Sequence, residues 1–298
     1  MYDILIIGAG PAGLSAAIYA KRAGKTVLVL ERKTPGGQLS TIDSIENYPP
    51  YPSVTGPELA MQFFERAVAL GADIRFEDVT EILYEPIKKI TTLSGNIYEG
   101  KSIILATGAE PKPLGLEGES KLTGKGVSYC ATCDGALYKG KPVAIIGKGA
   151  HVKEEAIFLS AHANRVYMLF EKSAPHLDIH EDNIEILQNV KPLEFIIENG
   201  ILSGVHLLDA DGTTKTLSVN GFFIALGNTP ANRLCTKIPI TEKGYIPTDA
   251  EMQTSINGVF AAGDIRDKKL RQIITAVSDG ATAAVSALRF IKNIKTED

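Results

Sequence analysis

The sequence predicts an α/β protein of two domains, each a parallel β-sheet covered by helices, with the second domain inserted in the first. Three observations lead to this prediction. Two units of buried strand, glycine turn and helix begin near residues 4 and 142. Apolar strands that end in small-residue turns follow each unit and recur near the C-terminus. The chain has 298 residues, about twice the usual length of a single domain.

The first unit occupies the N-terminus. Residues 4–7 form an apolar run typical of a buried strand, and residues 8–13 read Gly-Ala-Gly-Pro-Ala-Gly before a helical pattern over residues 14–22. A second strand is expected over residues 26–30, and Glu31 follows it. Glycines in such a turn let the backbone approach a pyrophosphate, and a carboxylate in this place binds a ribose 2′-hydroxyl. The unit therefore predicts a dinucleotide site.

The second unit repeats the pattern. Its strand, turn, helix and returning strand are expected over residues 142–146, 147–152, 153–160 and 165–170. Further apolar strands are expected over residues 103–109, 221–227 and 258–264. A long amphipathic helix is expected over residues 270–290. Proline and glycine interrupt the pattern near residues 111–113 and 241–244. We therefore expect two Rossmann-like, three-layer, nucleotide-binding domains: a discontinuous one of residues 1–112 and 242–298, and an inserted one of residues 113–241.

The composition is that of an ordinary globular protein, with 44% hydrophobic and 22% charged residues. The net charge of −4 argues against binding to nucleic acid, which favours a basic surface. Met1 runs almost directly into the first strand, so we expect no signal peptide, and no apolar run reaches the ~18 residues of a membrane span. We expect a cytoplasmic protein that binds neither nucleic acid nor a membrane.

Residues 130–134 read Cys-Ala-Thr-Cys-Asp and carry the most specific chemical signal in the chain. Two thiols separated by two residues can close a small disulfide that accepts and passes on two electrons. The same spacing is half of a zinc site, but the chain has three cysteines, and its paired histidines, His176 and His180, lie in a loop-like stretch. In a reducing cytosol such a pair favours catalysis over a structural bridge. We expect no metal, and Cys235 is expected to be an ordinary thiol.

With these motifs, essentially the whole chain resembles the low-molecular-weight thioredoxin reductases. The glycine turn with Glu31, the loops 36–39 and 45–49, and the segments 106–108, 263–264 and 271–273 agree with that family in order and spacing. The resemblance implies an FAD cofactor. It places the FAD contacts at Gly8, Gly10, Pro11, Ala12, Gly13, Glu31, Arg32, Gly37, Gln38, Leu39, Asn47, Val79, Ala106, Thr107, Gly108, Gly263, Asp264, Arg271, Gln272 and Ile273.

The resemblance also assigns roles within this set. It implies that Asp264 holds a ribityl hydroxyl and that the helix beginning at Gln272 points its N-terminus at the flavin ring. The positive end of a helix can stabilise negative charge on a reduced flavin. A helix N-cap is the other role open to Asp264, and the two roles are compatible.

For the cysteine segment, the resemblance implies that Cys133 exchanges electrons with the flavin and that Cys130 attacks the disulfide of thioredoxin, the expected substrate. It implies that Asp134 donates and accepts protons, because moving electrons between a dithiol and a flavin also moves protons. A capping role is the alternative for Asp134. The family resemblance further implies a homodimer.

The second unit departs from the family pattern. NADPH-dependent members are expected to have Gly-x-Gly-x-x-Ala here, followed by a His-Arg-Arg run and a further arginine that bind the 2′-phosphate. Val152 stands at the third small position, where we expect its branched side chain to obstruct helix packing and pyrophosphate approach. The phosphate-binding positions read Phe170, Glu171 and Lys172, with His176 at the later arginine. A carboxylate would then face the phosphate, so NADPH is not expected to bind.

Three interpretations of this departure remain open. Glu171 could bind the ribose of NADH. It follows the first glycine of its turn, Gly147, by 24 positions, whereas Glu31 follows Gly8 by 23, and this offset disfavours the interpretation. A ferredoxin could instead supply the electrons, as in the ferredoxin-dependent flavin thioredoxin reductases, which this chain resembles in keeping the FAD motifs and the cysteine pair while lacking the NADPH motifs. A sensor flavoprotein is the third, in which the cysteine pair would have no use. We expect an FAD-dependent thioredoxin reductase with ferredoxin as its donor.

Overall fold

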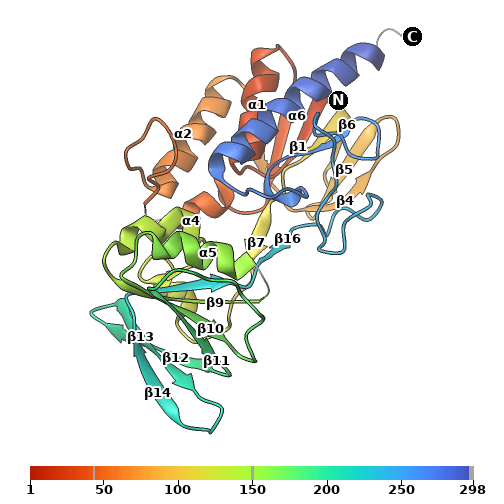
Figure 1. Cartoon of the computed structure of the whole chain (residues 1–298). Helices are drawn as coiled ribbons and strands as arrows, with labels where there is room; N and C mark the ends of the chain where they lie inside the picture. The colour runs from red at the N-terminus through yellow and green to blue at the C-terminus, as the bar shows by residue number, and fades with distance from the viewer. Residues whose placement is uncertain (43, 149–150, 295–298) are drawn as a thin grey trace. The chain divides into compact units, whose positions relative to one another are not determined.

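The computed structural model describes residues 1–42, 44–148 and 151–294 (Figure 1). The chain divides into two compact units, one formed by Met1–Glu110 with Thr229–Asp298 and the other by Pro111–Asn228. The first boundary lies beside the expected one, but the second lies earlier than the predicted 241/242. It lies earlier because Leu234, Cys235 and Ile238 are buried in the core of the first unit.

The first unit is built on a seven-stranded sheet in the order β3-β2-β1-β6-β5-β4, with β17 paired to β6. The strands are β1 (Tyr2–Ile7), β2 (Val27–Glu31), β3 (Asp73–Phe76), β4 (Val79–Leu83), β5 (Lys88–Thr92), β6 (Ile97–Leu105) and β17 (Val259–Ala261). β1 pairs in parallel with β2 and β6, whereas β4, β5 and β6 pair antiparallel. The strands predicted over residues 4–7 and 26–30 are confirmed as β1 and β2.

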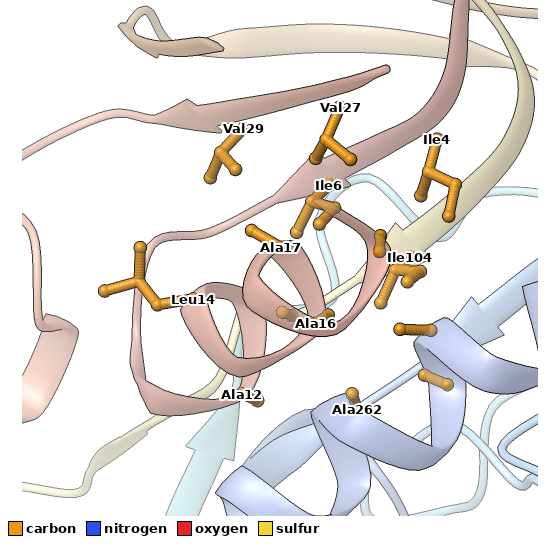
Figure 2. Close-up of a cluster of buried hydrophobic side chains, with 14 of the residues drawn as sticks. Ile4, Ile6, Ala12, Leu14, Ala16, Ala17, Val27, Val29, Ile104 and Ala262 are labelled. Carbon is orange, nitrogen blue, oxygen red and sulfur yellow. The ribbon is translucent and has the colours of Figure 1, made fainter. Parts of the chain in front are cut away.

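Helices and loops bury both faces of β1. Helices α1 (Pro11–Arg22), α2 (Gly56–Ala69) and α6 (Ile273–Ile294) belong to this unit. Ile4 and Ile6 pack with α1 and α6 in one core (Figure 2), whereas Leu5 and Ile7 pack in a second core on the opposite face. This alternation of fully buried side chains is typical of a central parallel strand. Packing on both faces holds the carboxyl end of β1 in place, and the glycine turn begins at this end.

Helix α6 differs from one expectation. It is long and apolar enough to pass as a membrane-spanning helix, with a mean hydropathy of 1.2, although no such run was expected. Ala283, Ala284 and Ala287 are fully buried in the core that α6 shares with α1. Packing against α1 therefore accounts for the apolar face of this helix.

The second unit contains a five-stranded parallel sheet in the order β11-β10-β9-β15-β8. Its strands are β8 (Val127–Ser128), β9 (Pro142–Gly147), β10 (Arg165–Phe170), β11 (Ile184–Gln188) and β15 (Gly221–Ala225). Helix α5 (His151–Ser160) packs on one face. The other face shares a core with an antiparallel sheet of β12 (Lys191–Glu198), β13 (Ile201–Leu208) and β14 (Thr214–Ser218). The predicted fold class, two Rossmann-like domains with the second inserted in the first, is confirmed.

The remaining elements are short. They are η1 (Gly37–Thr41), β7 (Ala109–Pro111), α3 (Glu119–Leu122), α4 (Ala131–Asp134), η2 (Gly135–Tyr138), β16 (Asn228–Pro230) and η3 (Gly263–Ile265). β7 and β16 pair with each other at the two places where the chain passes between the units.

Val152 is accommodated in the second unit. Gly149 and Ala150 of the predicted turn lie outside the described residues. The Val152 side chain is fully buried in the core between α5 and the sheet. A Cβ placed on Gly147 would lie 2.7 Å from Cγ2 of Val152, so the glycine makes room for the branched side chain. The prediction that Val152 obstructs helix-to-strand packing is therefore wrong.

Candidate active site

The glycines of the turn after β1 fall into two kinds: those that the packing of the fold requires and one that it does not. A Cβ on Gly8 would lie 2.3 Å from the carbonyl oxygen of Ala106, and a Cβ on Gly13 would lie 1.9 Å from that of Gly8. Packing of the fold therefore requires both. Gly10 has an ordinary φ of −76°, and its Cβ would have no neighbour within 4 Å. A glycine that the fold does not need is typical of close approach by a ligand.

A cavity of about 260 Å³ lies beside this turn. Five of the predicted cofactor residues line it: Gly8, Glu31, Arg32, Val79 and Thr107. The sequence interpretation missed Glu77, Asp78, Glu110 and residues 229–234, which also line it. The Gly-Asn-Thr-Pro turn after β15 was an available signal for the last of these, because ligands of such folds bind beyond the carboxyl ends of strands.

Glu31 lies where the first unit predicts it. Its Oε2 accepts a hydrogen bond from the backbone N of Ala9 at 2.7 Å, and its Oε1 accepts one from the N of Lys33 at 2.9 Å. The carboxylate is thus held by backbone donors against the glycine turn. Arg32 forms an exposed ion pair with Glu110, with a distance of 3.0 Å from Nη2 to Oε1.

Two predicted cofactor residues have buried oxygens without hydrogen-bond partners, namely Thr107 Oγ1 and Asp264 Oδ1. Burial raises the pKa of Asp264, and Lys268, 3.6 Å from Oδ1, and Arg271 offset this only in part. Buried polar atoms in proteins normally have partners. Both atoms, together with the open space at Gly10, fit a polar cofactor such as FAD.

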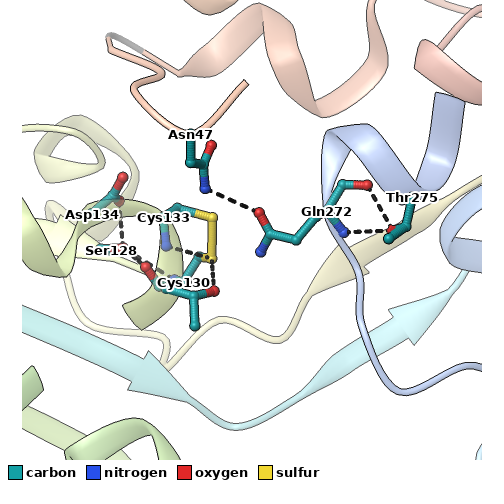
Figure 3. The surroundings of a disulfide bond; sticks show 8 residues. Asn47, Ser128, Cys130, Cys133, Asp134, Gln272 and Thr275 are labelled. Atoms are coloured by element: carbon teal, nitrogen blue, oxygen red, sulfur yellow. Dashed lines mark hydrogen bonds between the residues drawn. A yellow bond between two sulfur atoms is a disulfide. The ribbon is translucent and has the colours of Figure 1, made fainter. Parts of the chain in front are cut away.

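Asn47 and Gln272 come together from distant parts of the chain. Nδ2 of Asn47 donates to Oε1 of Gln272 at 3.1 Å, just before the first residue of α6 (Figure 3). Arg271 stacks on Tyr245 with its guanidinium carbon 4.0 Å from the ring centroid, and Ile273 packs against the small core around Leu39. The loops 36–39 and 45–49 and the start of α6 therefore form one region of the first unit.

The other predicted cofactor residues lie around the same turn. Pro11 is the first residue of α1, and the backbone N of Ala106 donates to the carbonyl of Ile7 at 2.8 Å. A Cβ placed on Gly37 would lie 3.6 Å from Cα of Gly10, and one placed on Gly263 would lie 2.9 Å from Cβ of Ala12. Nε2 of Gln38 donates to the carbonyl of Ala109, and the N of Ala231 donates to the carbonyl of Gly108 at 3.0 Å. The structure thus brings the predicted set together within one unit.

Cys130 and Cys133 form a disulfide in the second unit, directly after β8 (Figure 3). Both residues are half-buried. Cys130 caps the short helix α4, because its Sγ accepts a hydrogen bond from the backbone N of Cys133 at 3.2 Å. Cys235 is buried in the first unit, and burial raises the pKa of its thiol to about 11. Among the three cysteines, the disulfide pair is therefore the one that fits redox chemistry.

Asp134 ends helix α4 and lies beside Ser128. Burial raises the pKa of its carboxyl, and the hydrogen bond from Ser128 Oγ to Oδ2, 2.6 Å long, opposes the rise in part. The group therefore retains its proton to a higher pH than an ordinary aspartate. A carboxyl whose pKa is raised in this way is better suited to proton transfer than an ordinary aspartate.

The positions expected to meet a 2′-phosphate in the second unit present no basic cluster. Phe170 ends β10 and is buried in the core, while Glu171, Lys172 and His176 are exposed. Within the described ranges, no group of three or more His, Cys, Asp or Glu side chains could hold a metal ion.

Comparison with known proteins identifies the family. Residues 2–280 match the family described as pyridine nucleotide-disulphide oxidoreductase. The thioredoxin reductase of Bacillus subtilis strain 168 is 38% identical to the chain, over 99% of this chain and 96% of its own length. The chain belongs to the thioredoxin reductase family. A crystal structure of the thioredoxin reductase from Streptococcus pyogenes superposes on it with a TM-score of 0.93 and 36% identity, covering 98% and 99% of the two chains.

A second thioredoxin reductase structure is also similar to the chain. The ferredoxin-flavin thioredoxin reductase from Clostridium acetobutylicum is 34% identical, with a TM-score of 0.56 and 99% of both chains covered. As a member of the thioredoxin reductase family, the chain is an FAD-binding disulfide oxidoreductase. The Cys130–Cys133 pair fits the redox-active disulfide of such an enzyme.

Proposed function

We propose that this enzyme reduces thioredoxin with electrons from reduced ferredoxin, through FAD and the Cys130–Cys133 pair. The observation that carries the disulfide chemistry is the half-buried disulfide with the carboxyl of Asp134 one residue beyond it. The pair is placed at the carboxyl end of a parallel strand, where sites in such sheets normally form.

The first unit supplies the proposed FAD residues. Gly10 leaves space for the cofactor beside the backbone, and Thr107 Oγ1 and Asp264 Oδ1 would form hydrogen bonds with it. Bound FAD can accept electrons singly and deliver them in pairs, which suits a one-electron donor and a disulfide acceptor. The rest of the predicted cofactor set is proposed to complete the site.

The second unit supplies the thiol chemistry. In the reduced enzyme, the thiolate of Cys130 attacks a sulfur of the thioredoxin disulfide, which breaks that S–S bond and forms a mixed disulfide. The sulfur of Cys133 then attacks Cys130, re-forming the enzyme disulfide and releasing the second thioredoxin sulfur. Two electrons pass to thioredoxin, and protons reach its sulfurs, with Asp134 as the proposed donor. The backbone N–H of Cys133 would stabilise negative charge on the Cys130 sulfur.

Ferredoxin is favoured as the donor by the second unit. The exposed Glu171 and the core residue Phe170 stand where a phosphate clamp is expected. The likeness to the Clostridium acetobutylicum ferredoxin-flavin enzyme supports the same donor. A ferredoxin near −400 mV and a thioredoxin near −270 mV differ by ~130 mV, about 6 kcal/mol for two electrons. The transfer would run strongly toward reduced thioredoxin.

A pyridine nucleotide is the second candidate donor. The match over residues 2–280 to the pyridine nucleotide-disulphide oxidoreductases favours it, as does the accommodation of Val152 in a well-packed helix. Glu171 would then suit the ribose of NADH better than the phosphate of NADPH. The homodimer and the cytoplasmic location expected from the sequence are retained as parts of the proposal.

Anaerobic stopped-flow spectroscopy of the FAD-loaded enzyme separates these donors. The enzyme is mixed in turn with reduced ferredoxin, NADPH and NADH, and the loss of flavin absorbance is followed. We expect fast bleaching with ferredoxin and none of comparable rate with either nucleotide. Fast bleaching by NADPH or NADH would overturn the ferredoxin assignment.

A further inference from the structure

Ser128 forms hydrogen bonds with two residues of the Cys130–Asp134 segment, namely Cys130 and Asp134. Its side chain is almost fully buried, with 3% of the residue exposed. Its Oγ donates to Asp134 Oδ2 at 2.6 Å and accepts from the backbone N of Cys130 at 3.1 Å. The carbonyl oxygen of Cys130 is a second acceptor, 3.4 Å from the same Oγ (Figure 3). One hydroxyl therefore has two acceptors and one donor around it.

A hydroxyl has one hydrogen and two acceptor lone pairs. When Asp134 is ionised, the Ser128 hydrogen points to Oδ2, and a lone pair receives the N–H of Cys130. When Asp134 is protonated, its O–H donates to Ser128 Oγ, and the Ser128 hydrogen turns to the carbonyl of Cys130. The Cys130 carbonyl also accepts from the backbone N of Cys133 and of Asp134, each at 3.2 Å, so it shares its lone pairs in the second state. The hydrogens of Ser128, of protonated Asp134 and of the Cys130 N–H thus have an acceptor in both states, without movement of any heavy atom.

We propose that Ser128 is a positioning residue that holds Asp134 in both of its protonation states while fixing the backbone of Cys130. The inference rests on the proposed function, in which Asp134 gives a proton to a thiolate. In that step an O–H bond of the carboxyl breaks and an S–H bond forms. Because Ser128 changes only the direction of its hydrogen, no heavy atom between Ser128 and Asp134 has to move to follow the proton.

The other titratable groups around Asp134 are few among the described side chains. Tyr138 of η2 faces it, and burial together with the charge of Asp134 raises the pKa of Tyr138 to about 12. α5 packs on this region through Phe158 and Leu159, which lie against Gly135. The charged residues described on α5 are Lys153, Glu154 and Glu155. Oγ of Ser128 forms a hydrogen bond with Oδ2 of Asp134, and this bond lowers the pKa of the carboxyl.

The test compares wild type, Ser128→Ala and Ser128→Thr in single-turnover reduction of thioredoxin by the pre-reduced, FAD-loaded enzyme. Ser128→Ala should lower the rate about tenfold, the value of one hydrogen bond to a charged group. It should also move the loss of rate with rising pH to higher pH, because the carboxylate has lost its donor. Ser128→Thr keeps the hydroxyl and should restore the pH profile. Ser160→Ala, which removes a hydroxyl bonded to Ile157 O in the same unit, is the matched control.

A double-mutant cycle with Asp134→Asn distinguishes a Ser128 that acts through Asp134 from a Ser128 that only supports the local fold. If Ser128 acts through Asp134, Ser128→Ala should add little to the loss caused by Asp134→Asn. An equal loss in both backgrounds, or an unmoved pH profile in folded Ser128→Ala with full FAD content, would overturn the inference. Infrared titration of the Asp134 carboxyl stretch provides a readout without thioredoxin. A wild-type enzyme that fails to reduce thioredoxin refutes the proposed function, whereas an unshifted carboxyl titration in Ser128→Ala refutes the role of Ser128.

Discussion

Gly8 and Ala106 approach each other so closely that Gly8 has no space for a side chain. A Cβ on Gly8 would lie 2.3 Å from the Ala106 carbonyl oxygen, and its φ of 106° also disfavours other residues. Gly10, two residues later, meets neither restriction. The fold thus accounts for the first glycine, and the proposed FAD contact accounts for the second.

This contrast predicts different outcomes for two alanine substitutions. Gly8→Ala should destabilise the apoprotein by about 2 kcal/mol or more, because of the clash and the strained backbone. Gly10→Ala should leave the stability of the apoprotein nearly unchanged and weaken FAD binding about tenfold or more, because the new methyl group occupies the cofactor's place. Urea unfolding and FAD titration measure the two effects. Wild-type FAD affinity in Gly10→Ala would argue against cofactor contact at this turn.

Asp279 holds two buried cations in place. Its carboxylate lies 2.8 Å from Nη1 of Arg266 and 3.0 Å from Nζ of Lys268, and all three side chains are about one-tenth exposed. Asp279→Asn should cost about 3–5 kcal/mol, because the buried Arg266 loses this carboxylate and Lys268 is left with its longer, 3.6 Å pairing to Asp264. Glu99→Gln, which breaks an exposed pair with Lys89, is the control and should hardly move the urea midpoint. Equal midpoints for the two variants would contradict the importance of the buried network.

Asp3 predicts a pH dependence of stability. Burial raises the pKa of its carboxyl, but hydrogen bonds from Lys101 and Thr26 outweigh burial and lower the pKa to about 2. The folded pKa lies below the unfolded value near 4, so the group stabilises the fold above pH ~4 and loses this effect as the pH falls toward 2. Asp3→Asn should therefore cost about 2 kcal/mol at pH 7 and roughly half as much at pH 3. Urea unfolding at both pH values measures the difference, and an equal cost at both would refute the linkage.

Cys133→Ser tests the disulfide relay. The variant should bind FAD normally and fail to reduce thioredoxin, because no second sulfur remains to resolve the mixed disulfide. Cys235→Ala is the matched control. It removes a buried thiol that stays protonated, so it should cost about 1 kcal/mol of stability and leave turnover intact. Retained thioredoxin reduction by Cys133→Ser, measured as thiol formation, would refute the relay.

The local parts of the fold could be predicted from the sequence. The strand expected over residues 165–170 is β10, and the turn at residues 8–13 lies between β1 and α1. These elements follow from short-range hydrophobic patterns and glycine spacing, which need no knowledge of distant contacts.

Features that depend on packing between distant residues could not be predicted in the same way. The sequence predicts the second domain boundary too late in the chain, because nothing local shows that Leu234 and Ile238 complete the first core. The sequence pattern predicts Val152 to be an obstruction, because it does not show that Gly147, which has no side chain, lies against it. The part played by Ser128 depends on a turn that brings it back to Asp134.

The most direct test of the central claim is complete turnover under anaerobic conditions, measured as thioredoxin thiols formed with reduced ferredoxin, NADPH or NADH as the donor. We predict about one thioredoxin dithiol for every two ferredoxins oxidised, because each disulfide takes two electrons, and no comparable rate with either nucleotide. Thiol formation driven by NADPH or NADH, with none from ferredoxin, would contradict the account.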